Sequence, residues 1–312
     1  MKEHPNSDHI FEDSWHYQGW QIIDCQTCGF KHIFPLPEPE DTNQFYQEKY
    51  YRDIKPFPYD RYTSEQIEKT KGRILSNSLF SEIFDRVLTL KKTPIQNMLD
   101  IGCGNNLLSL YFQLNNWKAN IIEPNNDAAA FLRKFNLKVY CNPVEEIEKF
   151  ELNNLSFINM QFVLEHIRQP REVLIKMNKI LTPGGLIRIC VPNDFSEGQI
   201  AYQQYYEEKS HWVCLPDHIN YFSFESLERL LCSVGFKVIY RTTNFPLEFL
   251  LMGGINYYAN IEEQSRVRPF VTNFENSLLK TGRGDLLKQL YENLAQLGFG
   301  RSIFMYAIKE VN

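Results

Sequence analysis

The sequence predicts a mixed α/β fold built around a mostly parallel sheet. From Pro94 onward, short apolar runs alternate with stretches in which apolar residues recur at helical spacing. This alternation is typical of parallel strands joined by right-handed crossovers, with helices on both faces of the sheet. One apolar run ends in Asp100 and is followed by two closely spaced glycines, a pattern found at the ligand-binding edge of such sheets. A β-rich run at 301–308 closes the fold.

The expected elements follow one another in order along the chain. Apolar residues at helical spacing predict one long helix over 63–90. The strand candidates are 97–101, 118–123, 137–140, 155–160, 186–191 and 235–241, and the helices between the first five are 106–115, 126–135, 143–149 and 169–181. The Tyr-rich stretch 192–222 is expected to be irregular, and Ser223 is expected to cap the next helix. Residues 245–297 are expected to form a mostly helical insertion before the last strand.

Composition favours a soluble globular protein and limits its partners. Apolar residues make up 43% of the 312 residues, and charged residues make up 23%. A net charge of −5 and a pI near 5.9 disfavour a nucleic-acid partner, which normally requires a basic face. No apolar run approaches the ~20 residues that span a bilayer, and the scattered cysteines indicate reduced thiols. We therefore expect a cytoplasmic protein with no membrane partner and with a small-molecule or protein substrate.

The segment MLDIGCGNN, residues 98–106, carries the strongest functional signal. An apolar strand ends in Asp100, and Gly102 and Gly104 open the following helix. Because glycine lacks a Cβ atom, the backbone can turn tightly there and approach a ligand closely. The alternative is a dinucleotide fingerprint, G-x-G-x-x-G, but its third glycine would fall at Leu107. A carboxylate at Asp100 also suits a cationic ligand better than a pyrophosphate.

Three further features extend this motif along the chain. Glu123 ends the next strand, about twenty residues past the glycines, where an acidic side chain can accept ribose hydroxyls. The strand at 155–160 runs into QFVLEHI (161–167), and LTPGG (181–185) precedes the following strand. In their order and spacing, residues 95–243 resemble class I S-adenosylmethionine-dependent methyltransferases. The resemblance implies a Rossmann-like sheet, mostly parallel with an antiparallel last strand, and S-adenosylmethionine as the cofactor.

The resemblance also assigns cofactor-binding residues to this chain. They are Asp100, Gly102, Cys103, Gly104, Asn105, Glu123, Pro124, Val144, Gln161 and Phe162. Val144 matches a position whose backbone amide meets adenine in the family, although Pro143 stands where the family carries an acidic neighbour. Gln161 and Phe162 are expected to line the methionine end of the cofactor. The alternatives are a solvated strand-end acid for Glu123 and a plain core residue for Phe162.

His166 and His218 are the candidate catalytic bases, because an imidazole suits general base chemistry near neutral pH. The stretch PDHINYFS (216–223) resembles the E-H-x-x-Y-F-S stretch of sugar C-methyltransferases, with Asp217 and His218 at its acidic and histidine positions. Leu215 replaces a tyrosine of that family, which argues against C-methylation and for methylation at oxygen or nitrogen. The alternatives are structural roles for both histidines and a transfer driven by positioning alone.

Cys25 and Cys28 have the spacing of a metal knuckle, and a tetrahedral zinc ion needs four ligands. Residues 24–51 resemble the second knuckle and the following helix of a bacterial methyltransferase branch with an N-terminal Cys knuckle. The first knuckle of that branch, Cys-Pro-x-Cys, is replaced by His-Pro-Asn-Ser at residues 4–7. The histidines available as substitutes are His9, His16 and His32. We expect a vestigial knuckle with no metal, because Ser7 offers only a neutral hydroxyl.

The chain is expected to comprise an N-terminal arm, residues 1–62, and a methyltransferase domain, residues 63–312, with cap insertions at about 192–222 and 245–297. The expected function is methyl transfer from S-adenosylmethionine to a small-molecule acceptor at O, N or C, with sugars and sugar nucleotides among the candidates. The alternative is a non-catalytic or regulatory protein that binds the cofactor or a partner on the same fold. An RNA or protein methyltransferase is disfavoured by the acidic charge and by NMQF (159–162), where an NPPY-type loop would follow the fourth strand.

Overall fold

The computed structural model describes residues 9–38, 62–207 and 210–310. The chain divides into two compact units. Unit 1 comprises Met1–Pro35, Cys190–Arg229 and Tyr240–Met305, and unit 2 comprises Leu36–Ile189, Leu230–Ile239 and Tyr306–Asn312. The helix expected after the cysteine knuckle lies outside the described residues, and the domain boundary expected at residue 62 stays a prediction. Among the helices of the described ranges, none is both long and apolar enough to cross a membrane.

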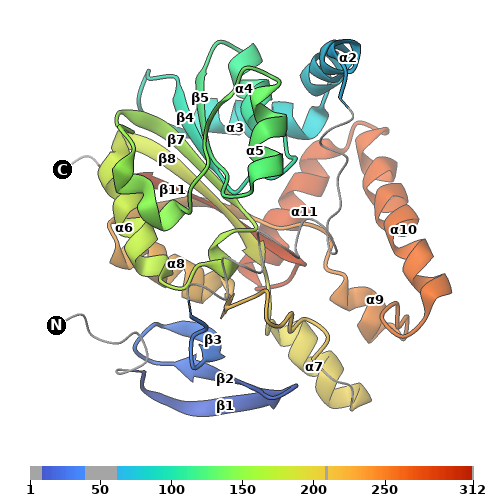
Figure 1. Ribbon diagram of the computed structural model, residues 1–312. Helices are drawn as coiled ribbons and strands as arrows, with labels where there is room; N and C mark the ends of the chain where they lie inside the picture. The colour runs from blue at the N-terminus through green and yellow to red at the C-terminus, as the bar shows by residue number, and fades with distance from the viewer. Residues whose placement is uncertain (1–8, 39–61, 208–209, 311–312) are drawn as a thin grey trace. The chain divides into compact units, whose positions relative to one another are not determined.

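The larger sheet has seven strands in the order β10-β11-β8-β7-β4-β5-β6 and is mostly parallel, with an antiparallel last strand (Figure 1). The strands are β4 (Asn97–Ile101), β5 (Lys118–Ile122), β6 (Lys138–Tyr140), β7 (Leu155–Gln161), β8 (Leu181–Pro192), β10 (Phe236–Thr242) and β11 (Ser302–Lys309). Strand β4 pairs in parallel with both β5 and β7, so Asp100 lies beside Ile121 on one side and Asn159 on the other. The expected α/β fold with a mostly parallel sheet is confirmed.

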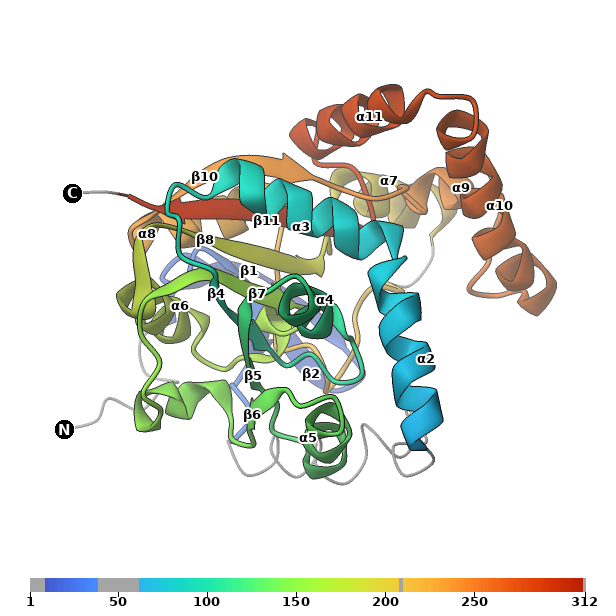
Figure 2. The same cartoon turned by 90° about the horizontal axis from the view of Figure 1, so that it is seen from above.

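Short helices join the strands of unit 2, as the sequence predicts. They are α4 (Leu108–Leu114), α5 (Asn126–Arg133) and α6 (Pro170–Ile180), with 3₁₀ turns η3 (Val144–Lys149) and η4 (Leu164–His166). Helix α4 packs on β5, and α5 packs on β6 (Figure 2). The Asn125 side chain accepts hydrogen bonds from the first backbone N–H groups of α5, which explains why this helix begins directly after the end of β5.

The expectation of one long helix over 63–90 is wrong, because the structure has two helices, α2 (Ser64–Leu75) and α3 (Ser78–Leu90). Asn77 causes the break. Its side-chain oxygen accepts a hydrogen bond from the N–H of Phe80 at 3.0 Å and so begins a new helix. The periodic pattern runs through the break because both helices bury apolar residues on one side, and periodicity alone therefore does not reveal a cap.

Strand β8 begins at Leu181 rather than at 186, so the LTPGG stretch belongs to the strand. Gly184 in this stretch has a φ of 74°, and a Cβ atom on it would lie 3.0 Å from the carbonyl oxygen of Lys92. The Lys92 N–H in turn donates to the carbonyl oxygen of Gly184 at 2.9 Å. A glycine is required there because the two backbone segments come too close for a side chain.

Unit 1 contains a second, antiparallel sheet that the sequence analysis did not predict. Its strands are β1 (Phe11–Tyr17), β2 (Trp20–Cys25), β3 (Phe30–Phe34) and β9 (Asn220–Tyr221), in the order β1-β2-β3-β9. A two-residue turn joins β1 to β2, and both of its residues, Gln18 and Gly19, have positive φ angles. Strand β1 is mostly exposed, so its sequence lacks the strict apolar alternation by which strands are recognised.

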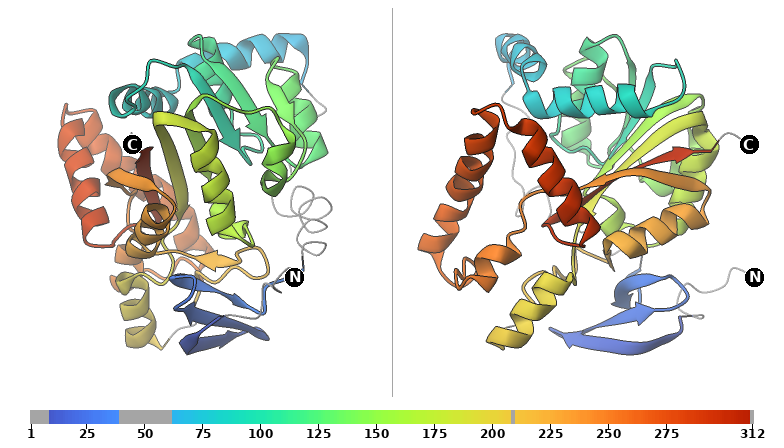
Figure 3. Two further views of the ribbon diagram at one scale, coloured as in Figure 1. Left: turned by 90° about the vertical axis from the view of Figure 1, so that its left-hand side faces the viewer. Right: turned by 180° about the vertical axis from the view of Figure 1, so that it is seen from behind.

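The remaining helices of unit 1 are α7 (Glu197–Tyr206), α9 (Glu248–Met252), α10 (Ile261–Leu279) and α11 (Gly284–Gln296), and α10 and α11 lie side by side (Figure 3). These last three helices confirm the mostly helical insertion expected at 245–297. The expectation that 192–222 is irregular is wrong for α7, which begins with a capping box between Ser196 and Gln199. Ser223 caps α8 (Phe224–Ser233) as expected, because its hydroxyl oxygen accepts from the N–H of Ser226 at 3.2 Å.

Candidate active site

The glycine loop after β4 has the conformation that the sequence predicts. Gly102 and Gly104 have φ angles of 63° and 55°, in the left-handed region that favours glycine. A Cβ atom added to Gly102 would lie only 2.7 Å from Cγ2 of Val163, on the segment that follows β7. Gly102 is therefore required both for its backbone conformation and for the close approach of these two segments.

Asp100 is buried at the base of this loop, with only 1% of its surface exposed. Its carboxylate accepts hydrogen bonds from Ser109 Oγ at 2.8 Å and from Asn159 Nδ2 at 2.7 Å. Burial raises the pKa of Asp100 to about 6, against the opposing effect of these hydrogen bonds and of the positive charge of Arg188. The side chain thus ties the start of α4 to strands β4 and β7, and its charge depends on pH below neutrality.

Arg188, on β8, is a buried cation that the sequence analysis missed. Its guanidinium donates from NH1 to Asn159 Oδ1 at 2.7 Å and to Gln161 Oε1 at 3.0 Å, and from Nε to the hydroxyl of Tyr306 at 3.2 Å. Gln161, predicted to line the methionine end of the cofactor, is oriented by this contact. The signal in the sequence is a lone arginine inside the apolar run LIRICV, because a cation in a buried strand needs polar partners.

Glu123, predicted to bind ribose, is fully buried at the end of β5. Its Oε2 accepts from the N–H of Gly104 at 2.7 Å, and its Oε1 accepts from the N–H of Asn125 at 2.9 Å. The carboxylate therefore holds the glycine loop against the next strand–helix junction. Burial raises the pKa of the Cys103 thiol well above its usual value, and the negative charges of Asp100 and Glu123 raise it further. The loop thus has a negative electrostatic environment, which suits a positively charged ligand.

The other predicted cofactor residues lie on the loops that follow the parallel strands of unit 2. Asn105 is exposed in the glycine loop, and Val144 is buried at the first position of η3. The carbonyl oxygen of Pro124 accepts a hydrogen bond from the Cys141 thiol at 3.5 Å. Phe162 is 40% exposed and is therefore not a core residue. Its φ angle of 57° is strained for an aromatic residue, a feature that concentrates at functional sites.

His166 and His218 lie in different units of the chain. In unit 2, His166 ends η4, and its Nε2 lies 3.9 Å from Oε1 of the buried Glu165. In unit 1, Nδ1 of His218 lies 3.7 Å from Oδ2 of Asp194, whose side chain is 1% exposed. The other oxygen of Asp194 accepts a hydrogen bond from Arg301 NH1 at 3.2 Å. His218 and Arg301, both partly exposed, thus lie on either side of the buried Asp194 and form an Asp194–His218–Arg301 cluster with it.

Other polar side chains of unit 1 interact electrostatically with this cluster. Burial and the positive charge of Arg301 together lower the pKa of His211 to about 4, against the opposing effect of Asp194. Arg301 itself has a raised pKa, because the negative charges of Asp194 and Glu248 outweigh its burial. Arg301 therefore carries the compensating positive charge for Asp194. Neither Asp194 nor Arg301 could be predicted from the sequence, since they are 107 positions apart and no local spacing connects them.

The cysteine pair lies in unit 1 with two of the three histidines considered as substitutes. Four potential metal ligands lie together there, one nitrogen or sulfur atom from each side chain, and these atoms are all within 4.8 Å of one another. The four residues are His9, Cys25, Cys28 and His32. His16 does not belong to this cluster, since it pairs with Gln21 on the β1–β2 hairpin. All seven cysteines lie in the described ranges, and none of them forms a disulfide there.

No curated protein matches the chain. Among solved structures, it is similar to a SAM-dependent methyltransferase from Archaeoglobus fulgidus, with 16% identity, a TM-score of 0.46 and coverage of 78% of this chain and 94% of that one. A second is Phospholethanolamine N-methyltransferase 2 of Haemonchus contortus, with 17% identity, a TM-score of 0.49 and coverage of 90% and 62%. A third is a plantazolicin methyltransferase bound to SAH, with 16% identity, a TM-score of 0.47 and coverage of 86% and 94%.

A methyltransferase-domain model matches residues 69–241, which is more than half of the chain and includes the glycine loop, Glu123, His166 and His218. The chain belongs to the methyltransferase-domain family, and its cofactor is S-adenosylmethionine.

Proposed function

We propose that this methyltransferase acts on a hydroxyl group of a small molecule, with His218 as the base that removes the hydroxyl proton. The observation that supports this proposal is the contact of His218 with Asp194, a buried carboxylate whose second oxygen is bound by Arg301. A histidine beside a carboxylate is a recurrent arrangement for proton removal, and the 3.7 Å separation needs only a small movement to become a hydrogen bond. An alcohol needs such a group, because it does not lose its proton near neutral pH without help.

The glycine loop fits the cofactor on two physical grounds. At Gly102 and Gly104 the positive φ angles favour glycine, so the backbone carries no side chain at these two positions that would hinder the approach of a ligand. Asp100 and Glu123 supply negative charge beside the loop, which suits the sulfonium. The residues proposed to hold the cofactor are those expected from the sequence: Asp100, Gly102, Cys103, Gly104, Asn105, Glu123, Pro124, Val144, Gln161 and Phe162. When bound, S-adenosylmethionine supplies an electrophilic methyl group on a positively charged sulfur.

Each residue of the Asp194–His218–Arg301 cluster has a separate role in the proposed proton transfer. Nε2 of His218 accepts the hydroxyl proton, while its Nδ1–H faces Asp194 and stabilises the imidazolium that forms. Arg301 binds the far oxygen of Asp194 and compensates its charge, so the carboxylate stays in place beside His218. The acceptor oxygen, having lost its proton, is then the nucleophile. His166, with Glu165 beside it, is the second candidate for this role.

The test is turnover by the His218→Ala variant, measured as SAH formation with a panel of hydroxylated small molecules that includes sugars and sugar nucleotides. We expect kcat to fall by roughly 10²–10⁴-fold, a typical loss when a general base is removed, with little change in SAH affinity. Asp194→Asn should lower kcat with KM nearly unchanged. His16→Ala is the matched control, since His16 lies on exposed strand β1, and it should keep full activity.

Full activity of His218→Ala would contradict the assignment of the base. If the double variant His166→Ala/His218→Ala is also fully active, positioning of the acceptor alone drives the transfer. Wild-type SAH binding without methylation of any acceptor in the panel would favour the alternative of a cofactor-binding protein.

A further inference from the structure

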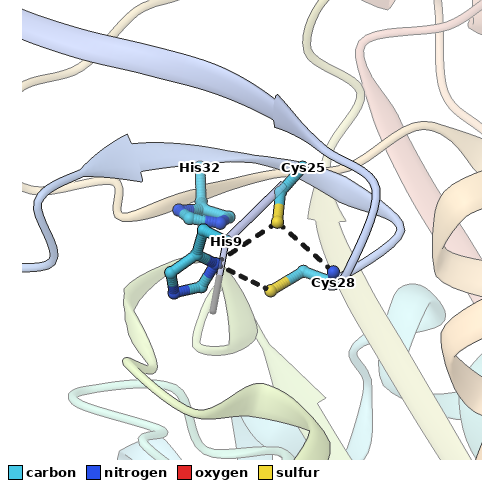
Figure 4. Close-up of side chains that lie close together, drawn as sticks. All are labelled: His9, Cys25, Cys28 and His32. Atoms are coloured by element: carbon cyan, nitrogen blue, oxygen red, sulfur yellow. Dashed lines mark hydrogen bonds between the residues drawn. The ribbon is translucent and has the colours of Figure 1, made fainter. Parts of the chain in front are cut away.

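The side chains around the Cys25–Cys28 turn form a compact group of metal donors (Figure 4). Nδ1 of His9 lies 3.3 Å from Sγ of Cys25 and 3.6 Å from Sγ of Cys28. The N–H of Cys28 donates to Sγ of Cys25 at 3.4 Å, so the turn itself directs both sulfur atoms to one side. His32, on β3, completes the group of four.

The backbone holds these donors in place. The turn closes with a hydrogen bond from the N–H of Gly29 to the carbonyl oxygen of Cys25 at 2.8 Å, and Gly29 has a φ of 76°. The segment that carries His9 is fixed to the same turn, because the Gln26 N–H donates to the carbonyl oxygen of Ile10 at 2.8 Å. His9 therefore approaches the cysteine pair from the segment before β1 and His32 approaches it from β3, in an arrangement set by main-chain contacts.

The observed spacing matches that of a zinc site. Zinc binds thiolate sulfur at about 2.3 Å and imidazole nitrogen at about 2.0–2.1 Å, so tetrahedral geometry separates a nitrogen donor from a sulfur donor by roughly 3.6 Å. The distances of 3.3 and 3.6 Å from His9 to the two sulfurs agree with this value. Two sulfurs and two imidazoles form a donor set that zinc prefers, whereas magnesium and calcium prefer oxygen.

His32 gives an independent indication of a ligand. It is 1% exposed, and its Nδ1 lies 2.8 Å from the carbonyl oxygen of Ile33, to which it can donate a hydrogen bond. That bond leaves Nε2 as the nitrogen with the free lone pair, and no residue in the described ranges forms a hydrogen bond with this atom. A ring nitrogen bound to a backbone carbonyl, with the other nitrogen directed at a metal, is the usual arrangement of a histidine ligand.

We propose that His9, Cys25, Cys28 and His32 bind one Zn²⁺ ion. The sequence predicts a metal-free knuckle because residues 4–7 have lost the first Cys pair of the resembling branch. In the proposed site that pair is not needed, since His9 and His32 supply the third and fourth ligands. Four protein ligands leave no open position for water or substrate, so the role of the ion is structural. It joins the segment at His9 to β2 and β3 in a small sheet.

Metal content of the full-length protein tests this proposal. The protein is purified without a polyhistidine tag, dialysed to remove loosely bound metal, and examined by elemental analysis. We expect about one zinc per chain, lost in Cys25→Ser and in His32→Gln, because three ligands bind the ion much more weakly than four. Cys232→Ser and His16→Gln are the matched controls, since neither residue belongs to the cluster, and both should retain the zinc.

A second measurement keeps the test valid if the ligand variants fail to fold. Wild-type protein in which zinc has been exchanged for Co²⁺ should show the intense visible bands of a tetrahedral cobalt site and a sulfur-to-cobalt charge-transfer band. Zinc below about 0.1 per chain, together with the absence of these bands after incubation with Co²⁺, would overturn the proposal. A stoichiometric metal other than zinc would also contradict it. Zinc retained in both Cys25→Ser and His32→Gln would place the ion elsewhere.

Discussion

Replacement of Gly102 by alanine is expected to destabilise the glycine loop and weaken cofactor binding. The added Cβ atom would lie 2.7 Å from Cγ2 of Val163, and the residue would have to keep a φ of 63°. The left-handed conformation costs a non-glycine residue about 1–2 kcal/mol. Overpacking of a close contact costs about 1–3 kcal/mol. We therefore expect the free energy of unfolding to fall by about 2–5 kcal/mol.

The assay combines chemical denaturation with calorimetric titration of SAH. SAH affinity should fall about tenfold or more, since a loss of 1.4 kcal/mol in the bound loop already gives that factor. Gly72→Ala is the matched control, because Gly72 lies inside helix α2 with nothing within 4 Å of an added Cβ and no positive φ. That variant should gain about 0.5–1 kcal/mol in stability and bind SAH normally.

Val163 allows the two costs to be separated. The double variant Gly102→Ala/Val163→Ala lacks the Cγ2 atom of Val163. The stability lost to the steric overlap should therefore be recovered, while the stability lost to the positive φ of residue 102 should not. A double-mutant cycle should thus give a favourable coupling of about 1–3 kcal/mol between the two changes. Wild-type stability and wild-type SAH affinity in Gly102→Ala would refute the reasoning, because the loop would then not approach Val163 or the cofactor.

Two further predictions concern buried polar contacts elsewhere in the fold. Asp100 has a pKa raised to about 6 in the folded protein from 3.8, so the folded state binds its proton more tightly than the unfolded state. The free energy of unfolding of the wild type, relative to that of Asp100→Asn, should therefore be greatest below pH 4. It should decrease by on the order of 3 kcal/mol as pH rises towards 6. Denaturation curves without this pH-dependent difference between the two proteins would contradict the prediction. Gly300→Ala should be much more destabilising than Gly298→Ala, as measured by thermal unfolding. Both glycines have positive φ angles, but only at Gly300 would a Cβ atom overlap Thr243 Oγ1. Equal losses in the two variants would show that this contact does not matter.

The parallel sheet could be predicted from the sequence because its strands are buried on both faces. Leu155–Met160 is fully buried, so four of its six residues are apolar with no helical spacing, which distinguishes it from the amphipathic helices around it. The glycine loop could be predicted for a similar reason. A positive φ at Gly102 and Gly104 is a local requirement that favours glycine, so it can be recognised from the residue type alone.

The parts that could not be predicted depend on contacts between distant residues. Asp194 and Arg301 interact across 107 positions, and nothing in the local pattern of either residue indicates the other. The start of α7 did leave a signal, since Ser196 and Gln199 form a capping box. That signal was masked because the large side chains of this helix are tyrosines, whose hydroxyl groups make them weak markers of a buried face, and Tyr205 and Tyr206 are in fact exposed.

Titration of the unmodified protein with SAH by calorimetry tests the central claim most directly. The claim is that the loop of Gly102 and Gly104, braced by Asp100 and Glu123, binds the cofactor of a methyltransferase. The account predicts binding of one SAH per chain with a Kd in the micromolar range, about −8 kcal/mol, and no comparable heat with NAD. Absence of heat and of any thermal shift at millimolar SAH would contradict it.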